Sequence, residues 1–289
     1  MHSLPTHLAA PPRHVPLSLR ILNFFNGAAQ VGWAVFGFGM IFFWTFGSNA
    51  DFSFATFHGT GRATGRVVRV EDTGASENKS RVRASHYQYS VAGSIFDGKS
   101  YATGAAPAEG AEVAVEYDEG NPKRSRISGM RRAMFGPWAM VVAVFPLVGF
   151  VILFFATRSG IKRNHLLREG ILTTGTLLRK EPTNVTVNRR RVWELTFEFQ
   201  DRLGQRQEVS ARTTDTHRLE DEAAEPLMYD PNDSTRAYVL DEVPSRPRFE
   251  GNGEIAGRGV AAVFALLLPL LVIGINALAA AVKLGVVRW

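Results

Sequence analysis

Charged residues are absent from three long stretches of the chain, residues 21–50, 133–157 and 259–282, and are dense elsewhere. Each stretch has at least 24 residues, whereas about 20 apolar residues cross a hydrocarbon core as a helix. The last stretch carries thirteen Leu, Ile, Val and Phe residues, which outweigh the unfavourable insertion of Pro269 and Asn276. The pattern predicts three transmembrane helices, at 21–47, 133–157 and 259–282.

The first of these helices is the least apolar, because Asn23, Asn26 and Gln30 lie in its opening turns. Its span proper is expected from about Ala28 to Phe46. A cleaved signal peptide is the alternative, but the apolar region is too long and its Pro-rich preface too extended for that class. We therefore expect an uncleaved anchor after an amino-terminal tail at 1–20.

The two polar segments between the helices resemble each other. Thr, Gly, Arg and Glu of the segment at 64–71 recur at 174–181 with a constant offset of 110, and Tyr117-Asp118 recurs as Tyr229-Asp230 with an offset of 112. Ordered matches at nearly the same offset indicate an internal repeat. The repeat predicts two related β-domains, at 60–130 and 170–240, with a linker at 241–258.

Both copies show the alternation of apolar and polar residues that is typical of strands. The alternating residues are Tyr87, Tyr89 and Val91 in one copy and Leu195, Phe197 and Phe199 in the other. Turns are expected at Asp97-Gly98 and at 201–204, a fourth strand around Val115 and Leu227, and a fifth at 125–129 and 235–240. Five short strands in each copy fit a small antiparallel β-barrel or roll. The fold class is therefore a membrane protein with α-helical spans and two five-stranded all-β modules.

The closing segment of the first copy, Val113-Ala114-Val115-Glu116-Tyr117-Asp118-Glu119-Gly120-Asn121-Pro122, follows a span, a T-G-x-V-V-x-V-E strand and paired aromatic strands. This order resembles the bacterial family catalogued as domain of unknown function 3592. The second copy departs from it, ending Tyr229-Asp230-Pro231-Asn232-Asp233. The resemblance implies a membrane-tethered β-domain and carries no established activity.

The cysteine content and the net charge limit the kinds of site and binding partner that the chain can have. The chain has no cysteine, which removes disulfides and thiolate sites and suits a bacterial envelope protein. The formal net charge is +6, and much of the excess of basic residues lies beside the spans. Basic residues there meet anionic lipid head groups, so we expect contact with lipid and no binding of nucleic acid. The basic residues beside the second span are Lys123, Arg124, Arg126, Arg131, Arg132, Arg158, Lys162, Arg163 and Arg168.

An odd number of spans places the two β-domains on opposite sides of the membrane. Arg13 and Arg20 precede the first span, whereas no base follows it until Arg62, which favours a cytoplasmic amino terminus. The second span has five basic residues before it and four after it, which leans the other way. The preferred topology has the first β-domain outside and the second in the cytoplasm of a bacterial inner membrane.

Candidate chemistry is sparse. Asp215, His217, Glu220 and Asp221 suggest a metal site, but a solvated acidic loop is the preferred interpretation. The Tyr-Asp pairs are interpreted as turns capped by the aspartate, and Gly65, Gly175, Thr64 and Thr174 as strand residues. Arg189, Arg190 and Arg191 are interpreted as a solvated hairpin tip rather than a grip on phosphate or lipid. Within the spans, Gly32 and Gly39 suit close helix approach, and Asn276 suits a bond to a neighbouring helix.

These observations predict no catalytic, cofactor-binding or metal-ligating residue. The expected function is a non-enzymatic membrane protein whose β-domains bind or position envelope partners. A metal-dependent enzyme using the His217 loop, a small transport or channel subunit, and a homo-oligomer remain the alternatives.

Overall fold

The structure, a computed structural model, describes residues 8–220 and 223–286 of the chain. It forms two compact units, one of Met1–Val35 with Val148–Trp289 and one of Phe36–Leu147. Each unit contains one five-stranded β-sheet and parts of the helices, and each has its own buried core.

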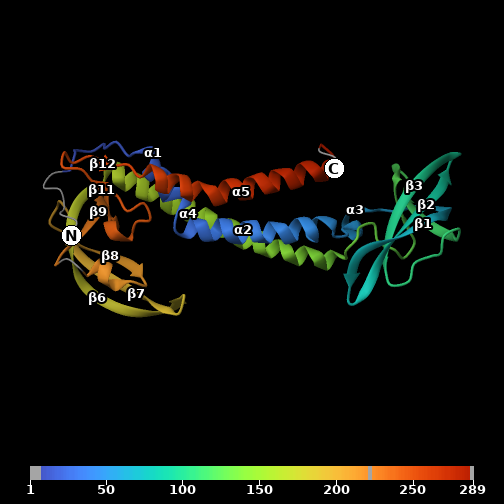
Figure 1. The fold of residues 1–289 in the computed structure, drawn as a ribbon, viewed down its shortest axis with the longest axis horizontal. Helices are drawn as coiled ribbons and strands as arrows, with labels where there is room; N and C mark the ends of the chain where they lie inside the picture. Colours follow the sequence, from blue (N-terminus) through green and yellow to red (C-terminus); the bar gives the residue numbers. More distant parts are fainter. Residues whose placement is uncertain (1–7, 221–222, 287–289) are drawn as a thin grey trace. The chain divides into compact units, whose positions relative to one another are not determined.

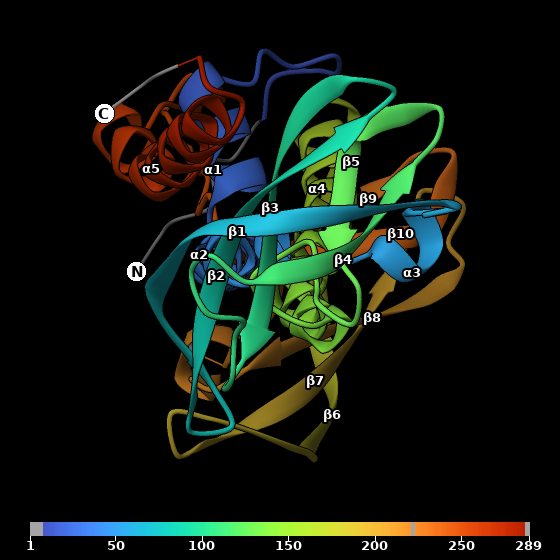
Figure 2. The same cartoon turned by 90° about the vertical axis from the view of Figure 1, so that its right-hand side faces the viewer.

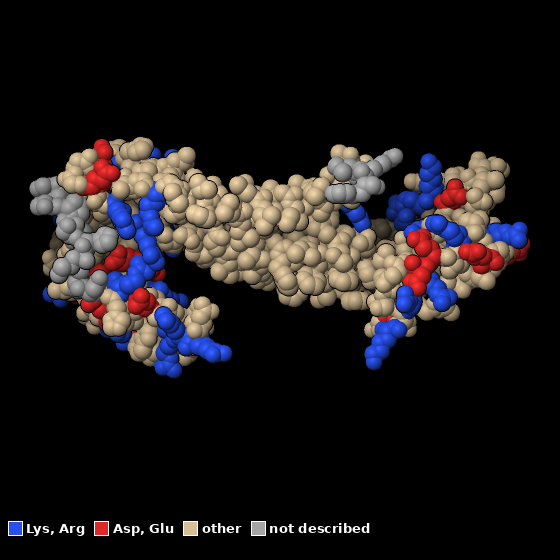
Figure 3. Space-filling model, viewed as in Figure 1, with Lys and Arg blue, Asp and Glu red and all other residues tan. Residues whose placement is uncertain are grey.

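Among the described residues, three helical segments are long and apolar enough to cross a membrane: Ala28–Asn49, Pro137–Glu169 and Gly259–Lys283. They contain the helices α2 (Ala28–Thr45), α4 (Val144–Glu169) and α5 (Gly259–Lys283), labelled in Figure 1. On the face drawn in Figure 3, the middle parts of these helices carry almost no charged side chains. This agrees with the three apolar stretches of the sequence.

The predicted helix at 21–47 is interrupted. A separate helix, α1 (Leu17–Phe25), precedes α2, since Asn26 is extended and Gly27 has a φ of +60°. Left-handed backbone of this kind breaks a helix and favours glycine. At the other end of its span, α4 continues through Gly160 to Glu169, past the predicted limit at 157, and the last turns of the helix bury Leu166 and Leu167 in the core of the unit.

The sheet of the unit Phe36–Leu147, here called the first module, is antiparallel with the strand order β3-β2-β1-β4-β5. Its strands are β1 (Gly61–Glu77), β2 (Ser80–Val91), β3 (Ser94–Thr103), β4 (Glu112–Asp118) and β5 (Asn121–Ile127). Figure 2 shows the sheet curled around its own interior. Tyr101 and Arg131 exchange two backbone hydrogen bonds of 2.8 and 2.9 Å, so the sheet is nearly closed into a barrel.

The second module lies in the other unit and has the order β10-β9-β6-β7-β8. Its strands are β6 (Ile171–Val187), β7 (Arg190–Gln200), β8 (Arg206–Thr213), β9 (Glu225–Asp230) and β10 (Asp233–Val239). Read from β8, this is the order of the first module. Phe197, Phe199 and Leu227 fill its interior, as Tyr87, Tyr89 and Val115 fill the first.

The two modules also share their irregularities. The pairing of β1 with β2 shifts between Val67 and Arg69, and that of β6 with β7 shifts between Leu177 and Arg179, 110 residues later. Such bulges bend and twist a strand at a defined point. Both hairpins then turn through two residues of positive φ, Asn78-Lys79 and Asn188-Arg189, as type I′ turns require.

One predicted turn is wrong. Asp97 and Gly98 lie inside β3, and the hairpin instead turns at Ala92-Gly93, with φ values of +49° and +80°. Gly98 faces Tyr87 across the ladder, and a Cβ at this position would lie 2.2 Å from the Tyr87 ring. The glycine makes room for an aromatic ring rather than for a turn. The predicted turn at 201–204 is correct: β7 ends at Gln200 and β8 begins at Arg206, with Asp201 Oδ1 accepting bonds from the backbone between them.

The segment predicted as a linker, 241–258, is folded. It begins inside the short 3-10 helix η4 (Leu240–Glu242) and contains the two-stranded hairpin of β11 (Arg248–Phe249) and β12 (Ile255–Ala256). Val243 and Ile255 are buried in one core with side chains of α1, α4, α5 and the second module. The second module is therefore packed onto the helix ends of its own unit.

The unit Phe36–Leu147 attaches its module through short helices next to α2 and α4. These are η1 (Gly47–Asn49), α3 (Ser53–Thr56) and η2 (Pro137–Ala143). Ala50, Phe135 and Ala139 form a small buried cluster there, with Phe46 and Ala75 packed against it. Ala75 belongs to β1, so this cluster joins the module to the helix ends.

Candidate functional site

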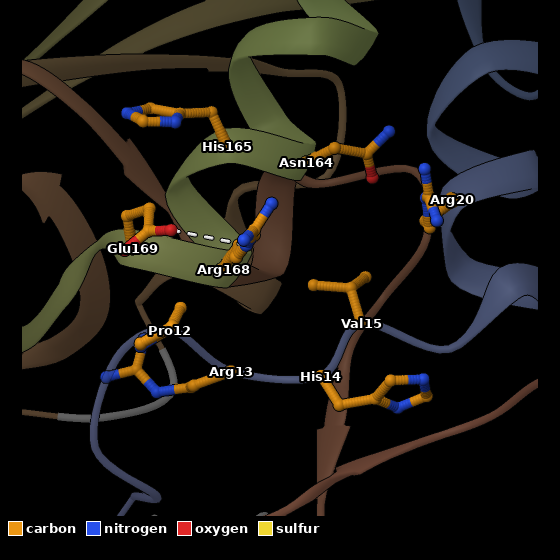
Figure 4. Close-up of a pocket in the computed structure, with 9 residues that line it drawn as sticks. All are labelled: Pro12, Arg13, His14, Val15, Arg20, Asn164, His165, Arg168 and Glu169. Atoms are coloured by element: carbon orange, nitrogen blue, oxygen red, sulfur yellow. Dashed lines mark ion pairs between the residues drawn. The ribbon is translucent and has the colours of Figure 1, made fainter.

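A basic pocket of about 520 Å³ lies beside the carboxyl end of α4. Figure 4 shows α4 on one side of it and the amino-terminal segment on the other. Its lining residues are Pro12, Arg13, His14, Val15, Arg20, Asn164, His165, Arg168 and Glu169. All of them belong to one unit.

Arg13 builds the pocket by fastening the amino-terminal segment to α4. Its Nη1 donates to Gly170 O at 2.7 Å and its Nε to Ala9 O at 2.6 Å, and its backbone N–H donates to Arg168 O at 2.8 Å. The last carbonyls of a helix lack partners within the helix and carry partial negative charge. Burial lowers the pKa of the Arg13 guanidinium, and Tyr238 and Glu169 partly offset this. The buried guanidinium is thus a structural cap, and the tail predicted at 1–20 is held in place from Ala9 onward.

The remaining charges face the opening. Arg20 and Arg168 are exposed, and the only carboxylate in the lining, Glu169, bonds Arg168 at 3.2 Å. His165 lies 3.3 Å from Asp230 of the second module. Guanidinium groups around a small cavity are suited to a phosphate or carboxylate. The arrangement offers anion binding, with no nucleophile and base in contact among the lining residues described.

The His217 loop is arranged differently from a metal site. Lys180 donates to both carboxylate oxygens of Glu220 at 2.8 Å and to Thr216 at 3.2 Å. His217 lies in the 3-10 helix η3 (Thr216–Leu219), and Asp221 lies outside the described residues. No group of three or more His, Asp or Glu residues that would hold a metal occurs in the described part of the chain.

The repeated Tyr-Asp motif forms turns, as predicted. Asp118 Oδ1 accepts a bond from the backbone N–H of Gly120 at 3.2 Å, and Asp230 Oδ1 accepts one from Asn232 at 2.9 Å. Gly65 has a packing role, since a Cβ there would lie 2.8 Å from Val115 and 2.9 Å from the Gln88 carbonyl. Gly175 is equally close to Leu227.

The basic cluster before the second span is engaged in its own module. Arg126 pairs with Glu116 at 2.7 Å, Arg131 with Glu77 at 2.7 Å and Arg124 with Asp118 at 3.8 Å. Most of its charge is thus already neutralised within the protein. The basic residues beside the pocket are a better candidate for anionic head groups.

A polar network that the sequence did not reveal surrounds Glu77 at the end of β1. Its carboxylate accepts bonds from Trp138 Nε1 at 2.6 Å and from Arg131 Nη1 and Thr103 Oγ1, both at 2.7 Å. Burial raises the pKa of this carboxyl, but the three hydrogen bonds outweigh burial and hold the pKa below its usual range. The network fixes the tip of the β1–β2 hairpin to the beginning of the second span.

The amide side chains near the spans bond protein groups rather than water alone. Gln30 Nε2 donates to Ala265 O of α5 at 2.7 Å, and Asn23 Nδ2 donates to Asn164 Oδ1 at 2.8 Å. Ala265 is the residue four before Pro269, so its carbonyl has no N–H partner in its own helix. Asn276, which was expected to bond a neighbouring helix, donates to Val272 O of α5 itself.

The predicted close approach of helices is confirmed at both glycines. A Cβ on Gly32 would lie 2.9 Å from Leu153 Cγ, and one on Gly39 would lie 2.5 Å from the backbone nitrogen of Pro146. Small residues let helix backbones pack at short distance in a membrane.

Among curated proteins, none matches the chain. Residues 63–131 match a family model described as "Domain of unknown function (DUF3592)". The matched residues include β2 to β5 and nearly all of β1. The match supports the assignment of the first module to this family.

Proposed function

We propose that the chain is a non-catalytic, multi-pass protein of a bacterial inner membrane whose β-modules bind or position other envelope components. The observation that carries the proposal is the attachment of each module to helix ends of its own unit. In Phe36–Leu147 the Glu77 network makes this attachment, and in the other unit a shared hydrophobic core does. A domain held in this way presents its surface at a defined height and orientation, which suits a positioning function.

We also propose that the second module is a second copy of the first. The shared strand order, the bulges 110 residues apart and the two positive-φ turns support a duplication. Irregularities shared by the two modules are stronger support than the order of strands alone, because a bulge at the same point of two strands is a specific feature of a fold.

Three spans would place the two modules on opposite sides of the membrane. Within one unit, the segment before α2 contacts the carboxyl end of α4, which leads into the second module, and the residue before α5 contacts α1. Arg13 N–H bonds Arg168 O, and Arg258 N–H bonds Ser18 Oγ at 2.8 Å. This agrees with an amino terminus on the same side as the second module.

The basic pocket supports contact with anionic lipid. Of its two exposed arginines, Arg20 lies in α1, before the apolar segment Ala28–Asn49, and Arg168 lies in the last turn of α4, at the end of Pro137–Glu169. Basic residues at this level attract anionic head groups. Lipid bound to the protein in native-lipid discs is expected to lose its anionic enrichment in R20Q/R168Q, relative to the wild type.

The rival functions have less support from the geometry. An enzyme built on the His217 loop would have to displace Lys180 from Glu220. A transport or channel role would need association of several copies, because three helices rarely enclose a pore.

The experiment that tests partner binding is photo-crosslinking in cells. A photoreactive residue replaces Ile95 or Leu203, which are 73% and 76% exposed in the first and second modules. Leu267 of α5, which is 54% exposed, serves as the control position. The proposal expects protein adducts of constant mass from at least one module position and none from Leu267. An absence of adducts at both module positions would contradict it.

A further inference from the structure

In the second module, the far end of the β6–β7 hairpin lacks a protein cover. We call the paired residues 181–187 and 190–194 the second arm, and the equivalent residues 71–77 and 80–84 the first arm. Val185 and Val187 of the second arm are 54% and 48% exposed. They are two residues apart in a strand and therefore lie on the same face.

The counterparts of these valines are covered. The arms have the same register: Glu77 pairs with Ser80, and Val187 pairs with Arg190. With the offset of 110, Val185 corresponds to Ala75 and Val187 to Glu77. Ala75 packs against the cluster of Ala50, Phe135 and Ala139, and Glu77 is only 8% exposed.

The cover of the first arm comes from the ends of candidate membrane spans. Trp138, which bonds Glu77, and Ala139 belong to the segment Pro137–Glu169. Phe46, which packs against the same cluster as Ala75, belongs to Ala28–Asn49. Tryptophan at the end of a span is typical of the membrane–water interface. The first arm therefore reaches the level at which the spans would enter the head-group region.

The second arm has the composition of a lipid-facing element. Three successive arginines begin at the second residue of its turn: Arg189, Arg190 and Arg191, all exposed. Within residues 8–220 and 223–286, no ion pair involves them. The arm ends on the side toward which α4 and α5 run from the sheet (Figure 1). Arginine places its charge among head groups while its stem and neighbouring aliphatic side chains contact the acyl boundary.

We infer that the second arm docks on the surface of a bilayer that contains anionic lipid. Val185 and Val187 enter the head-group region, and the three arginines bind lipid phosphates. The first arm performs the same docking on protein, through Ala75 and Glu77. The second arm has Val185 and Val187 where the first arm has Ala75 and Glu77. Two valines suit contact with lipid, whereas the acid of the first arm suits its hydrogen bond from Trp138. The docking rests on the proposed insertion of the spans and is independent of any protein partner.

The full chain in lipid nanodiscs tests this inference, and the absence of cysteine makes single-site labelling clean. An environment-sensitive fluorophore is attached to V187C, in discs of phosphatidylcholine alone or with phosphatidylglycerol. L203C, in the turn that follows the opposite end of β7, is the matched exposed control. L267C in α5 reports whether the span is in the bilayer.

With phosphatidylglycerol, the V187C probe is expected to shift to shorter wavelength and to be quenched by spin-labelled lipid, whereas the L203C probe is not. Replacement of Arg189, Arg190 and Arg191 by Gln is expected to abolish the quenching at position 187. Equal quenching at 187 and 203, or a response at 187 that ignores both the anionic lipid and the arginines, would overturn the inference. If neither V187C nor L267C is quenched, the proposed insertion of the spans is wrong. If L267C is quenched and V187C is not, the spans are inserted and only the docking of the second arm is wrong.

Discussion

At the residue scale, the polar groups near the spans are individually matched to partners. The carbonyl of Ala265 loses its N–H partner to Pro269, and Gln30 supplies a replacement from α2 at 2.7 Å. The presence of both residues is evident from the sequence, but their contact depends on the depth and rotation of two helices far apart in the chain. A hydropathy pattern gives neither the depth nor the rotation of a helix, so the hydrogen bond from Gln30 to Ala265 could not be predicted.

Replacement of Gln30 by Leu is expected to destabilise the protein by about 1 kcal/mol, because it leaves a carbonyl without a partner in an apolar environment. In a P269A background the residue at 269 regains an N–H that can bond Ala265 O, so Q30L should then cost much less. Unfolding of the four variants in detergent micelles forms a double-mutant cycle. An equal loss in both backgrounds would show that Gln30 acts by another route.

The Glu77 network makes a prediction about pH. The E77Q variant is expected to lose about 3 kcal/mol, because it leaves Arg131 without its counter-charge in a mostly buried site. Folding lowers the pKa of this carboxyl from its usual 4.5. Its contribution is therefore fully present above pH 4.5 and is lost as the pH falls through the lower value in the folded state.

The thermal midpoint in nanodiscs between about pH 3 and pH 7 measures this contribution. Above pH 4.5 the wild type should have the higher thermal midpoint. As the pH falls below 4.5, this advantage over E77Q should shrink until the two midpoints are equal. E112Q, on an exposed residue of the same module, is the control and should follow the wild type. A constant difference between wild type and E77Q at every pH would refute the assignment.

At the scale of elements, the hydropathy pattern and the similarity of the two polar segments predicted the apolar helices and the strands, and the errors have local causes. Asp97-Gly98 is a strong turn signal, yet Gly98 is needed opposite the ring of Tyr87. The segment 241–258 has the polar, glycine-containing composition of a linker, yet Val243 and Ile255 complete a core supplied by α1, α4, α5 and the second module. In both cases a contact distant in sequence overrides a local preference.

The contact of α2 with α4 yields a prediction at this scale. A Cβ on Gly39 would lie 2.5 Å from the backbone nitrogen of Pro146, which cannot rotate away as a side chain can. G39A is therefore expected to separate the helices and cost about 1–3 kcal/mol. G274A is the matched control, because a Cβ on Gly274 in α5 meets nothing within 4 Å. Equal stability of G39A and G274A in the same micelles would contradict the observed packing.

At the scale of the whole molecule, the sequence predicted the apolar helices and the two five-stranded sheets but not the pocket. The pocket joins Arg13 and Arg20 to Arg168 across about half of the chain, and it exists because Arg13 caps the end of α4. A lone arginine in a Pro-rich tail gives no sign of such a role. The unequal surroundings of the two arms were equally hidden, since they depend on which residues pack over them.

The central claim is that one β-module occurs twice, on opposite sides of a membrane. Cysteine at Ile95 in the first module or Leu203 in the second, both strongly exposed, allows labelling with a membrane-impermeant maleimide in cells that express the chain. The account predicts labelling of I95C in intact cells and of L203C only after permeabilisation. Labelling of both positions from the same side would contradict the three-span arrangement.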